Sequence, residues 1–261
     1  MKNKRLLCLG LSSLCLAGVV FCGWNFYQEM KPRVQAEQAY DQIRERAFRK
    51  SAAVMDSDED IMAVDTRTRK RPDFETLRQW NPDVIGWIWS PGSDIDYPVV
   101  QGEDNDYYLN HTADGLKSII GSIFVESQNR KEFQDDVTIL YGHHIRGGRM
   151  FSSLSGYKTQ GYYEEHPVLY LYTPDKDYRV DLFAGEILDG QIGSFPIIFE
   201  SADARERWLK KLLVSSTFKS SVEVEGNERI LALCTCSYEY NNARYVVYGV
   251  LSDMEEEQNE N

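Results

Sequence analysis

The sequence predicts a mainly β fold, a small barrel or sandwich preceded by helical segments. Short runs rich in Val, Ile and Tyr recur between residues 84 and 251, and these residue types favour strands. Turn-forming Gly, Pro, Asn and Asp separate the runs. Several short strands divided by turns favour a barrel or sandwich over a parallel sheet. With 261 residues, 42% of them hydrophobic, the chain suits one domain with appendages.

The N-terminus joins a basic tip, residues 1–5, to an apolar run without charge that continues through Trp24. The run approaches the ~20 residues that cross a bilayer as a helix, and the basic tip should stay cytoplasmic. Aromatic residues near its end resemble an interfacial belt. We therefore expect residues 6–27 to be an uncleaved single-pass transmembrane signal anchor, with the bulk of the chain outside the cell. A cleaved signal peptide is the competing interpretation.

Residues 28–73 are predicted to form an amphipathic helix and a charged linker. Within residues 35–50, apolar side chains recur at helical spacing. This stripe is short and weakly apolar, so it should lie on the domain rather than form a coiled coil. From residue 51 to residue 72 the periodicity is lost and the blocks DSDED and RTRKR indicate a solvated linker. The helical stripe consists of Ala36, Tyr40, Ile43 and Ala47.

Residues 74–252 are predicted to form the globular domain, and residues 253–261 an acidic tail. The domain should begin with a short helix at residues 74–80. A second helix, residues 202–218, interrupts the strands with Trp208, Leu209, Leu212 and Leu213 on one face. Strands are predicted at residues 84–90, 95–100, 122–125, 137–140, 168–172, 178–188, 230–236 and 244–251.

The last two predicted strands bring a thiol beside a guanidinium. Their connection, SYEYNNA, holds an Asn-Asn pair that favours a turn. If the strands pair antiparallel, Cys236 at the end of the first faces Arg244 at the start of the second. A neighbouring cation favours the thiolate, which is the nucleophilic form of cysteine. A proton carrier is then needed, and His143 and His144 are candidates because they follow a predicted core strand.

The positions of the cysteines and the net charge argue against a disulfide-stabilised domain and against nucleic-acid binding. Of five cysteines, only Cys234 and Cys236 lie beyond the N-terminal apolar run, so an exported domain would have no disulfide framework. Alternation places both on one face of their strand. Cys236 ends the apolar run, whereas Cys234 lies inside it. The net charge of -12 argues against a nucleic-acid partner.

Several segments resemble those of class B sortases, which are cysteine transpeptidases of Gram-positive bacteria. The motif LCTC, residues 233–236, resembles the TLxTC signature, and YGHHIRGGRMF resembles the histidine segment of class B. Residues 81–111 resemble the opening of the catalytic domain, and the likeness covers residues 74–251. Ala232 departs from the signature, which usually has Thr there. The resemblance implies a closed β-barrel of about eight strands, with N-terminal helices and a helix in the connection before the cysteine strand.

The resemblance also implies the roles of individual residues. Cys236 would be the nucleophile, and His143, rather than His144, the general acid and base because it directly follows Gly142. Arg244 would stabilise the oxyanion or hold the substrate. The substrate-binding residues would be Asn105, Leu109, Cys234 and Thr235.

The implied reaction cleaves a C-terminal sorting motif of a secreted protein after Thr and transfers the acyl group from Cys236 to an amine. The amine would belong to a cell-wall peptidoglycan precursor or to a pilin lysine, so surface-protein anchoring and pilus assembly both fit. No metal or cofactor is expected.

Two alternatives remain open at this point. Cys234, Cys236, His143 and His144 could form a structural zinc site in a non-catalytic surface module. The same triad could also serve a hydrolytic cysteine protease, in which water rather than an amine resolves the acyl-enzyme.

Overall fold

The computed structural model describes residues 2–52, 70–145, 147–189, 195–236 and 243–254. Most of the predicted linker, the turn after Cys236 and the acidic tail beyond residue 254 lie outside these ranges. For Cys236 the backbone is described and the side chain is not.

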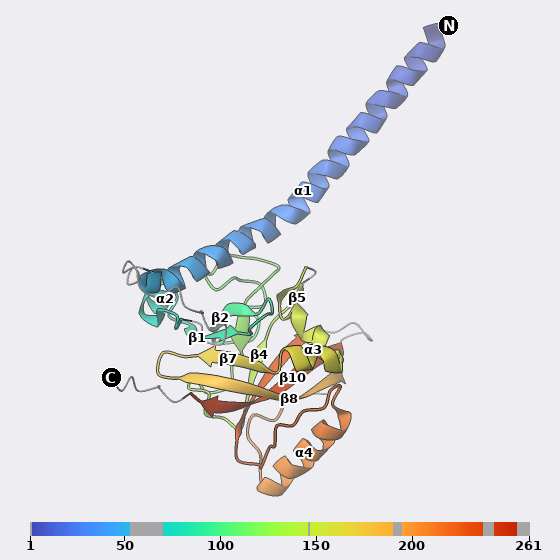
Figure 1. The fold of residues 1–261 in the computed structure, drawn as a ribbon. Helices are drawn as coiled ribbons and strands as arrows, with labels where there is room; N and C mark the ends of the chain where they lie inside the picture. The colour runs from blue at the N-terminus through green and yellow to red at the C-terminus, as the bar shows by residue number, and fades with distance from the viewer. Residues whose placement is uncertain (1, 53–69, 146, 190–194, 237–242, 255–261) are drawn as a thin grey trace, which may run out of the picture.

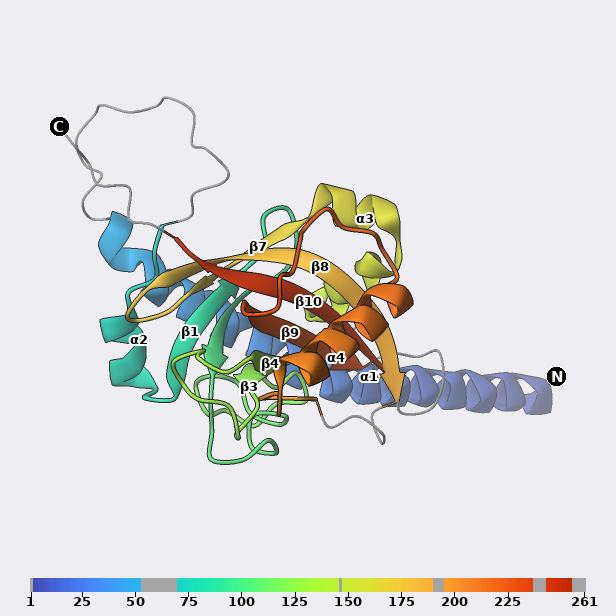
Figure 2. The same cartoon turned by 90° about the horizontal axis from the view of Figure 1, so that it is seen from below.

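Eight strands close into one barrel (Figures 1 and 2). They are β1 (Val84–Trp89), β2 (Asp96–Val100), β3 (Ile123–Val125), β4 (Val137–Tyr141), β7 (Val168–Tyr172), β8 (Asp177–Asp189), β9 (Arg229–Cys236) and β10 (Ala243–Asp253). Around the barrel their order is β1-β2-β3-β4-β9-β10-β8-β7. The predicted mainly β fold and the closed barrel of eight strands are therefore confirmed.

Strand direction decides which residues meet at each edge of the barrel. Most neighbours are antiparallel, but β4 runs parallel to β9, with Tyr141 opposite Cys234. The chain therefore leaves β4 and β9 at the same edge. In the antiparallel pair of β9 and β10, Cys236 lies opposite Arg244, which is the predicted register.

The helices partly follow the sequence pattern. They are α1 (Lys2–Ala52), α2 (Phe74–Trp80), the 3₁₀ helix η1 (Ser152–Lys158), α3 (Gln160–Glu165) and α4 (Ala202–Ser215). The segment from β5 (His144–Ile145) and β6 (Arg149–Met150) through η1 to α3 was not predicted, because such short elements leave no periodic pattern.

The face predicted for α4 is wrong at Leu213, which is 50% exposed, whereas Arg205 is buried. Positions 205, 208, 209 and 212 follow the i, i+3, i+4, i+7 spacing of one face, and position 213 lies beyond it.

α1 projects from the barrel at its N-terminal part and lies along the barrel at its C-terminal part (Figure 1). The predicted stripe of α1 is buried there, with Ala36, Tyr40, Ile43 and Ala47 at most 5% exposed, so its docking on the domain is confirmed. Side-chain descriptions in α1 begin at Leu16, which leaves residues 6–15 of the predicted anchor outside them. Across the described residues, no helix has an apolar stretch long enough to cross a membrane.

Two apolar layers hold the barrel together, one inside it and one under α4. On β9, Leu231 and Leu233 belong to the interior cluster. Ala232 and Cys234 alternate with them and belong to the outer cluster, which includes Leu212 of α4. Figure 2 shows α4 lying against the barrel. Because alternate residues of a strand point to opposite faces, β9 is buried on both sides and the backbone at its end is held firmly.

Candidate active site

A cavity of about 240 Å³ opens at the barrel edge where β4 and β9 end. Six of the seven predicted site residues line it, and the seventh, Cys236, ends β9 directly after Thr235. Four further residues, which the sequence did not single out, complete the wall. The lining consists of Asn105, Asp106, Leu109, Phe124, Tyr141, Gly142, His143, Cys234, Thr235 and Arg244.

The strand order places the backbone of Cys236 between those of His143 and Arg244. Tyr141 is opposite Cys234 in the parallel pair, so two residues further along each chain lie His143 and Cys236. On the other side of β9, Arg244 of β10 is opposite Cys236. Neighbouring strands are about 4.8 Å apart. A histidine after β4, a cysteine at the end of β9 and an arginine at the start of β10 therefore lie side by side at one edge of the barrel.

Gly142 locks the end of β4 to the end of β9. Its N–H donates to the carbonyl of Cys234 at 3.1 Å, and its carbonyl accepts from the hydroxyl of Thr235 at 2.8 Å. A Cβ at this position would lie 2.5 Å from Cδ1 of Ile123 and 2.7 Å from the Phe151 ring. Only glycine fits without displacing these side chains, so its packing determines where the backbone of His143 begins.

The ring of His143 is oriented by a backbone carbonyl. Its Nε2 lies 2.7 Å from the carbonyl oxygen of Leu109. A carbonyl oxygen can only accept a hydrogen bond, so Nε2 carries the proton and Nδ1 is the basic nitrogen of the neutral ring. Leu109 was predicted as a pocket residue; its backbone role has no signal in the sequence, because a carbonyl is present at every position.

A buried carboxylate, Glu126, supports the cavity wall and was missed by the sequence analysis. It is 8% exposed and accepts from the side-chain amide of Asn105 at 2.6 Å and from the hydroxyl of Tyr141 at 3.0 Å. Burial and then the charge of Glu126 raise the pKa of Tyr141 above its ordinary value, so the phenol stays protonated and donates. The available clue was a carboxylate directly after the apolar run of β3.

Arg244 contributes hydrogen-bond donors to the cavity, and Cys234 contributes apolar surface. Nη1 of Arg244 donates to the carbonyl of Ala243 at 3.2 Å, and a guanidinium has five N–H donors, so others remain for a ligand. Cys234 is 2% exposed and packs in the outer apolar layer at the cavity wall. Within the described ranges, no three His, Cys, Asp or Glu side chains are grouped to hold a metal ion.

Comparisons with known proteins concern both sequence and structure. The family model described as the Sortase domain matches residues 89–252. Sortase B of Listeria monocytogenes is 30% identical over 253 residues, which cover 96% of this chain and 99% of that protein. Sortase B of Staphylococcus aureus is 32% identical over 171 residues, covering 66% of this chain and 70% of that protein.

Two solved structures have the same fold. Staphylococcus aureus sortase B complexed with MTSET has a TM-score of 0.73 and 27% identity, covering 85% of this chain and 90% of that chain. Clostridium perfringens sortase B has a TM-score of 0.65 and 34% identity, covering 69% of this chain and 100% of that chain.

The packing around Gly142 predicts a local loss of stability on substitution. Gly142→Ala should lower the free energy of unfolding by about 1–3 kcal/mol, since an added methyl group overpacks a filled site. Gly161→Ala is the matched control, because a Cβ at Gly161 in α3 meets nothing within 4 Å. The control should be neutral or stabilising by up to about 1 kcal/mol. Urea denaturation measures both, and equal stabilities would contradict the close packing at Gly142.

Proposed function

This chain belongs to the class B sortases, which are cysteine transpeptidases, and from that premise we propose that Cys236 is the nucleophile, His143 the general acid and base, and Arg244 the oxyanion donor. The observation that carries the proposal is the edge shared by β4, β9 and β10, where the backbone of Cys236 lies between the other two residues. Membership in this family of transpeptidases contradicts the alternative of a non-catalytic module.

In the first step the thiolate of Cys236 attacks the carbonyl carbon of the scissile peptide bond. A carbon–sulfur bond forms, and the carbonyl oxygen becomes an oxyanion that N–H groups of Arg244 stabilise. His143 in its charged form gives a proton to the departing amine as the carbon–nitrogen bond breaks. The product of this step is a thioester on Cys236 and a neutral imidazole.

In the second step an amine attacks the thioester. The neutral ring of His143 takes a proton from the incoming amine at its basic nitrogen, the new amide bond forms and Cys236 leaves as the thiolate. The hydrogen bond from Nε2 to Leu109 holds the ring in one orientation through both steps. Water in place of the amine gives hydrolysis by the same residues.

We propose a sorting signal of a secreted protein as the acyl donor and an amine-bearing peptide as the acceptor. Related solved structures are a Staphylococcus aureus sortase B-substrate complex and a sortase B complexed with triglycine. In the present cavity, Leu109 and Phe124 offer apolar surface. Asn105 offers the second hydrogen of its amide nitrogen, since Glu126 takes the first. Cys234 and Thr235 also line the cavity and would contact the substrate there.

The acceptor class follows from which amine resolves the acyl-enzyme. A peptidoglycan-precursor peptide would indicate wall anchoring, and a lysine side chain of a pilin would indicate pilus assembly. Offering both amines to the enzyme with one sorting peptide, and identifying the products by mass spectrometry, distinguishes these two acceptors from water.

Removing the nucleophile should abolish transpeptidation, and removing the proton carrier should slow it strongly. Cys236→Ala should leave no turnover, and His143→Ala should lower kcat by about 10²–10⁴, the usual contribution of general acid–base catalysis. His144→Ala is the matched control, because His144 lies in β5 and not at the edge shared with Cys236. Cleavage of a sorting peptide measures all three. Full activity in Cys236→Ala, or a larger loss in His144→Ala than in His143→Ala, would refute the assignment.

The guanidinium of Arg244 should matter through its geometry as well as its charge. Arg244→Lys keeps the charge but loses the planar fork, so turnover should fall by roughly 10²–10³, the cost of losing one oxyanion donor. Alkylation of Cys236 should persist. Arg179→Lys is the control, since Arg179 forms a surface ion pair with Asp181 on β8. An Arg244→Lys enzyme with the parental rate would make Arg244 a surface residue only.

We also propose that the N-terminal segment anchors the enzyme in the cell membrane with the catalytic domain outside. The support is the basic tip followed by the charge-free run through Trp24. The full-length chain should remain with membranes after alkaline washing, whereas a chain starting at Arg33, which keeps the docking stripe of α1, should be released. Release of the full-length chain under these conditions would count against the anchor.

A further inference from the structure

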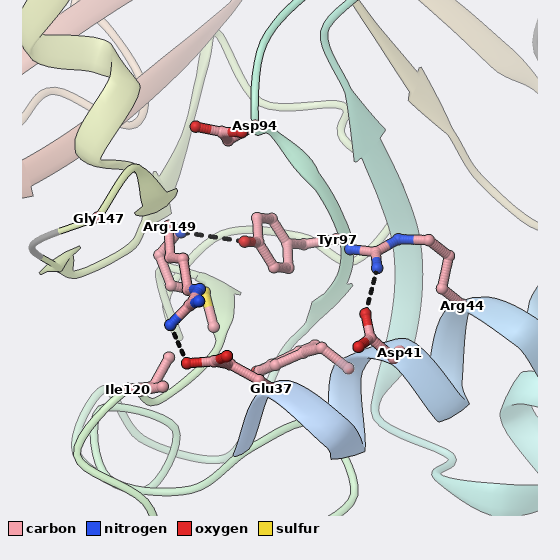
Figure 3. A pocket seen from close by; sticks show the side chains of 10 residues that line it. Glu37, Asp41, Arg44, Asp94, Tyr97, Ile120, Gly147 and Arg149 are labelled. Atoms are coloured by element: carbon pink, nitrogen blue, oxygen red, sulfur yellow. Dashed lines mark hydrogen bonds and ion pairs between the residues drawn. The ribbon is translucent and has the colours of Figure 1, made fainter. Parts of the chain in front are cut away.

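α1 reaches the barrel across a cavity of about 340 Å³ (Figure 3). Side chains from α1 make contacts around this cavity. Glu37 forms an ion pair with Arg149 of β6, and Arg44 bonds Asp96 of β2 at 2.8 Å. In addition to packing its buried stripe, α1 makes a further polar contact that leads toward His143.

That contact is the hydroxyl of Tyr40. Tyr40 is 5% exposed, and its hydroxyl donates to the carbonyl of Gly121 at 2.6 Å and lies 3.2 Å from Oγ of Ser122. The ring packs edge-to-face on Tyr97 at 5.4 Å. Burial raises the pKa of Tyr40, so the hydroxyl remains a donor at physiological pH.

Gly121 packs closely against the carbonyl of Leu109 and the ring of His143. Its φ of +62° is in the left-handed region, which favours glycine. A Cβ at Gly121 would lie 2.6 Å from the carbonyl oxygen of Leu109 and 3.0 Å from Cδ2 of His143. The same carbonyl oxygen receives the Nε2 proton of His143. A displacement of Gly121 would therefore move the imidazole or its acceptor.

A second set of contacts holds the chain that follows His143. The ring of Tyr97 contacts that of Tyr40, and its hydroxyl accepts from the N–H of Met150 at 3.2 Å (Figure 3). The N–H of Phe151 donates to the carbonyl of His143 at 3.1 Å. Arg149, paired with Glu37 of α1, belongs to the same β5–β6 hairpin. α1 thus supports His143 from the Gly121 side and from the hairpin side.

We infer that Tyr40 is a positioning residue for His143, which holds Gly121 so that the Leu109 carbonyl and the imidazole keep the orientation needed for proton transfer. The inference rests on the proposed role of His143 as general acid and base. It makes docking of the N-terminal helix a requirement for the transfer step, although Tyr40 does not line the substrate cavity.

The test removes only the hydroxyl, with Tyr40→Phe in the full-length enzyme. Tyr157→Phe is the matched control, since Tyr157 is 1% exposed and also donates to a backbone carbonyl, that of His166 at 2.8 Å. With a sorting peptide, Tyr40→Phe should lower kcat by about tenfold, because a misplacement of about 1 Å in a reacting group can cost about 10² in rate. KM should stay within about twofold, and Tyr157→Phe should keep the parental kcat.

The second readout follows the imidazole itself. The chain has four histidines, so ¹⁵N-histidine labelling gives few signals, and His111→Gln, His144→Gln and His166→Gln identify those of His143. In the parent, Nε2 of His143 should carry the proton. In Tyr40→Phe the ¹⁵N shifts should move toward a mixture of tautomers, while Tyr157→Phe should leave them in place.

The outcomes separate the inference from the proposed function. A lower kcat together with altered His143 signals, confined to Tyr40→Phe, supports the inference. Parental kcat or parental His143 signals in Tyr40→Phe overturn it, and so does an equal loss in Tyr157→Phe, which would indicate a general structural effect. His143→Ala, measured in parallel, tests the proposed function separately. If that variant stays active, the role of His143 in catalysis fails whatever Tyr40 does.

Discussion

The parallel pairing of β4 with β9 is the constraint on which the site depends. Because both strands run in one direction, their chains emerge at the same barrel edge, and the residues that follow Gly142 and Thr235 lie next to each other. An antiparallel pairing would place His143 and Cys236 at opposite ends of the barrel. Gly142, directly after β4, makes two hydrogen bonds to β9 and is crowded by Ile123 and Phe151. These contacts fix the end of β4 against β9.

A hydrogen-bonded polar network supports the wall of the cavity. A buried carboxylate is costly unless its oxygens accept hydrogen bonds. The two oxygens of Glu126 accept from the side chains of Asn105 and Tyr141, and a further donor is the backbone N–H of Gln128. The N–H of Ser127 in turn bonds Asn105 at 2.8 Å. With each partner held by another, the polar groups facing the substrate side have little freedom to reorient.

α1 joins this site to the N-terminal part of the chain. Its buried stripe packs on the barrel. Its Tyr40 donates to the carbonyl of Gly121, and its Glu37 pairs with Arg149 in the β5–β6 hairpin that begins at His144. The same helix continues toward the N-terminus, away from the barrel (Figure 1). The attachment of the N-terminal helix therefore uses contacts with two segments that lie beside His143.

The sequence by itself determined the strand content, the stripe of α1 and the facing of Cys236 and Arg244. Each of these features depends on spacing within one element or across one short turn. The resemblance to sortases further selected His143 over His144 and gave the number of strands. Only the tertiary structure showed that the Leu109 carbonyl bonds the His143 ring, that Glu126 bonds Tyr141, and that Tyr40 bonds Gly121. Their contacts join segments far apart in the chain through carbonyls and buried polar atoms. Such contacts have no local pattern, because they exist only once the barrel has closed and α1 has docked on it.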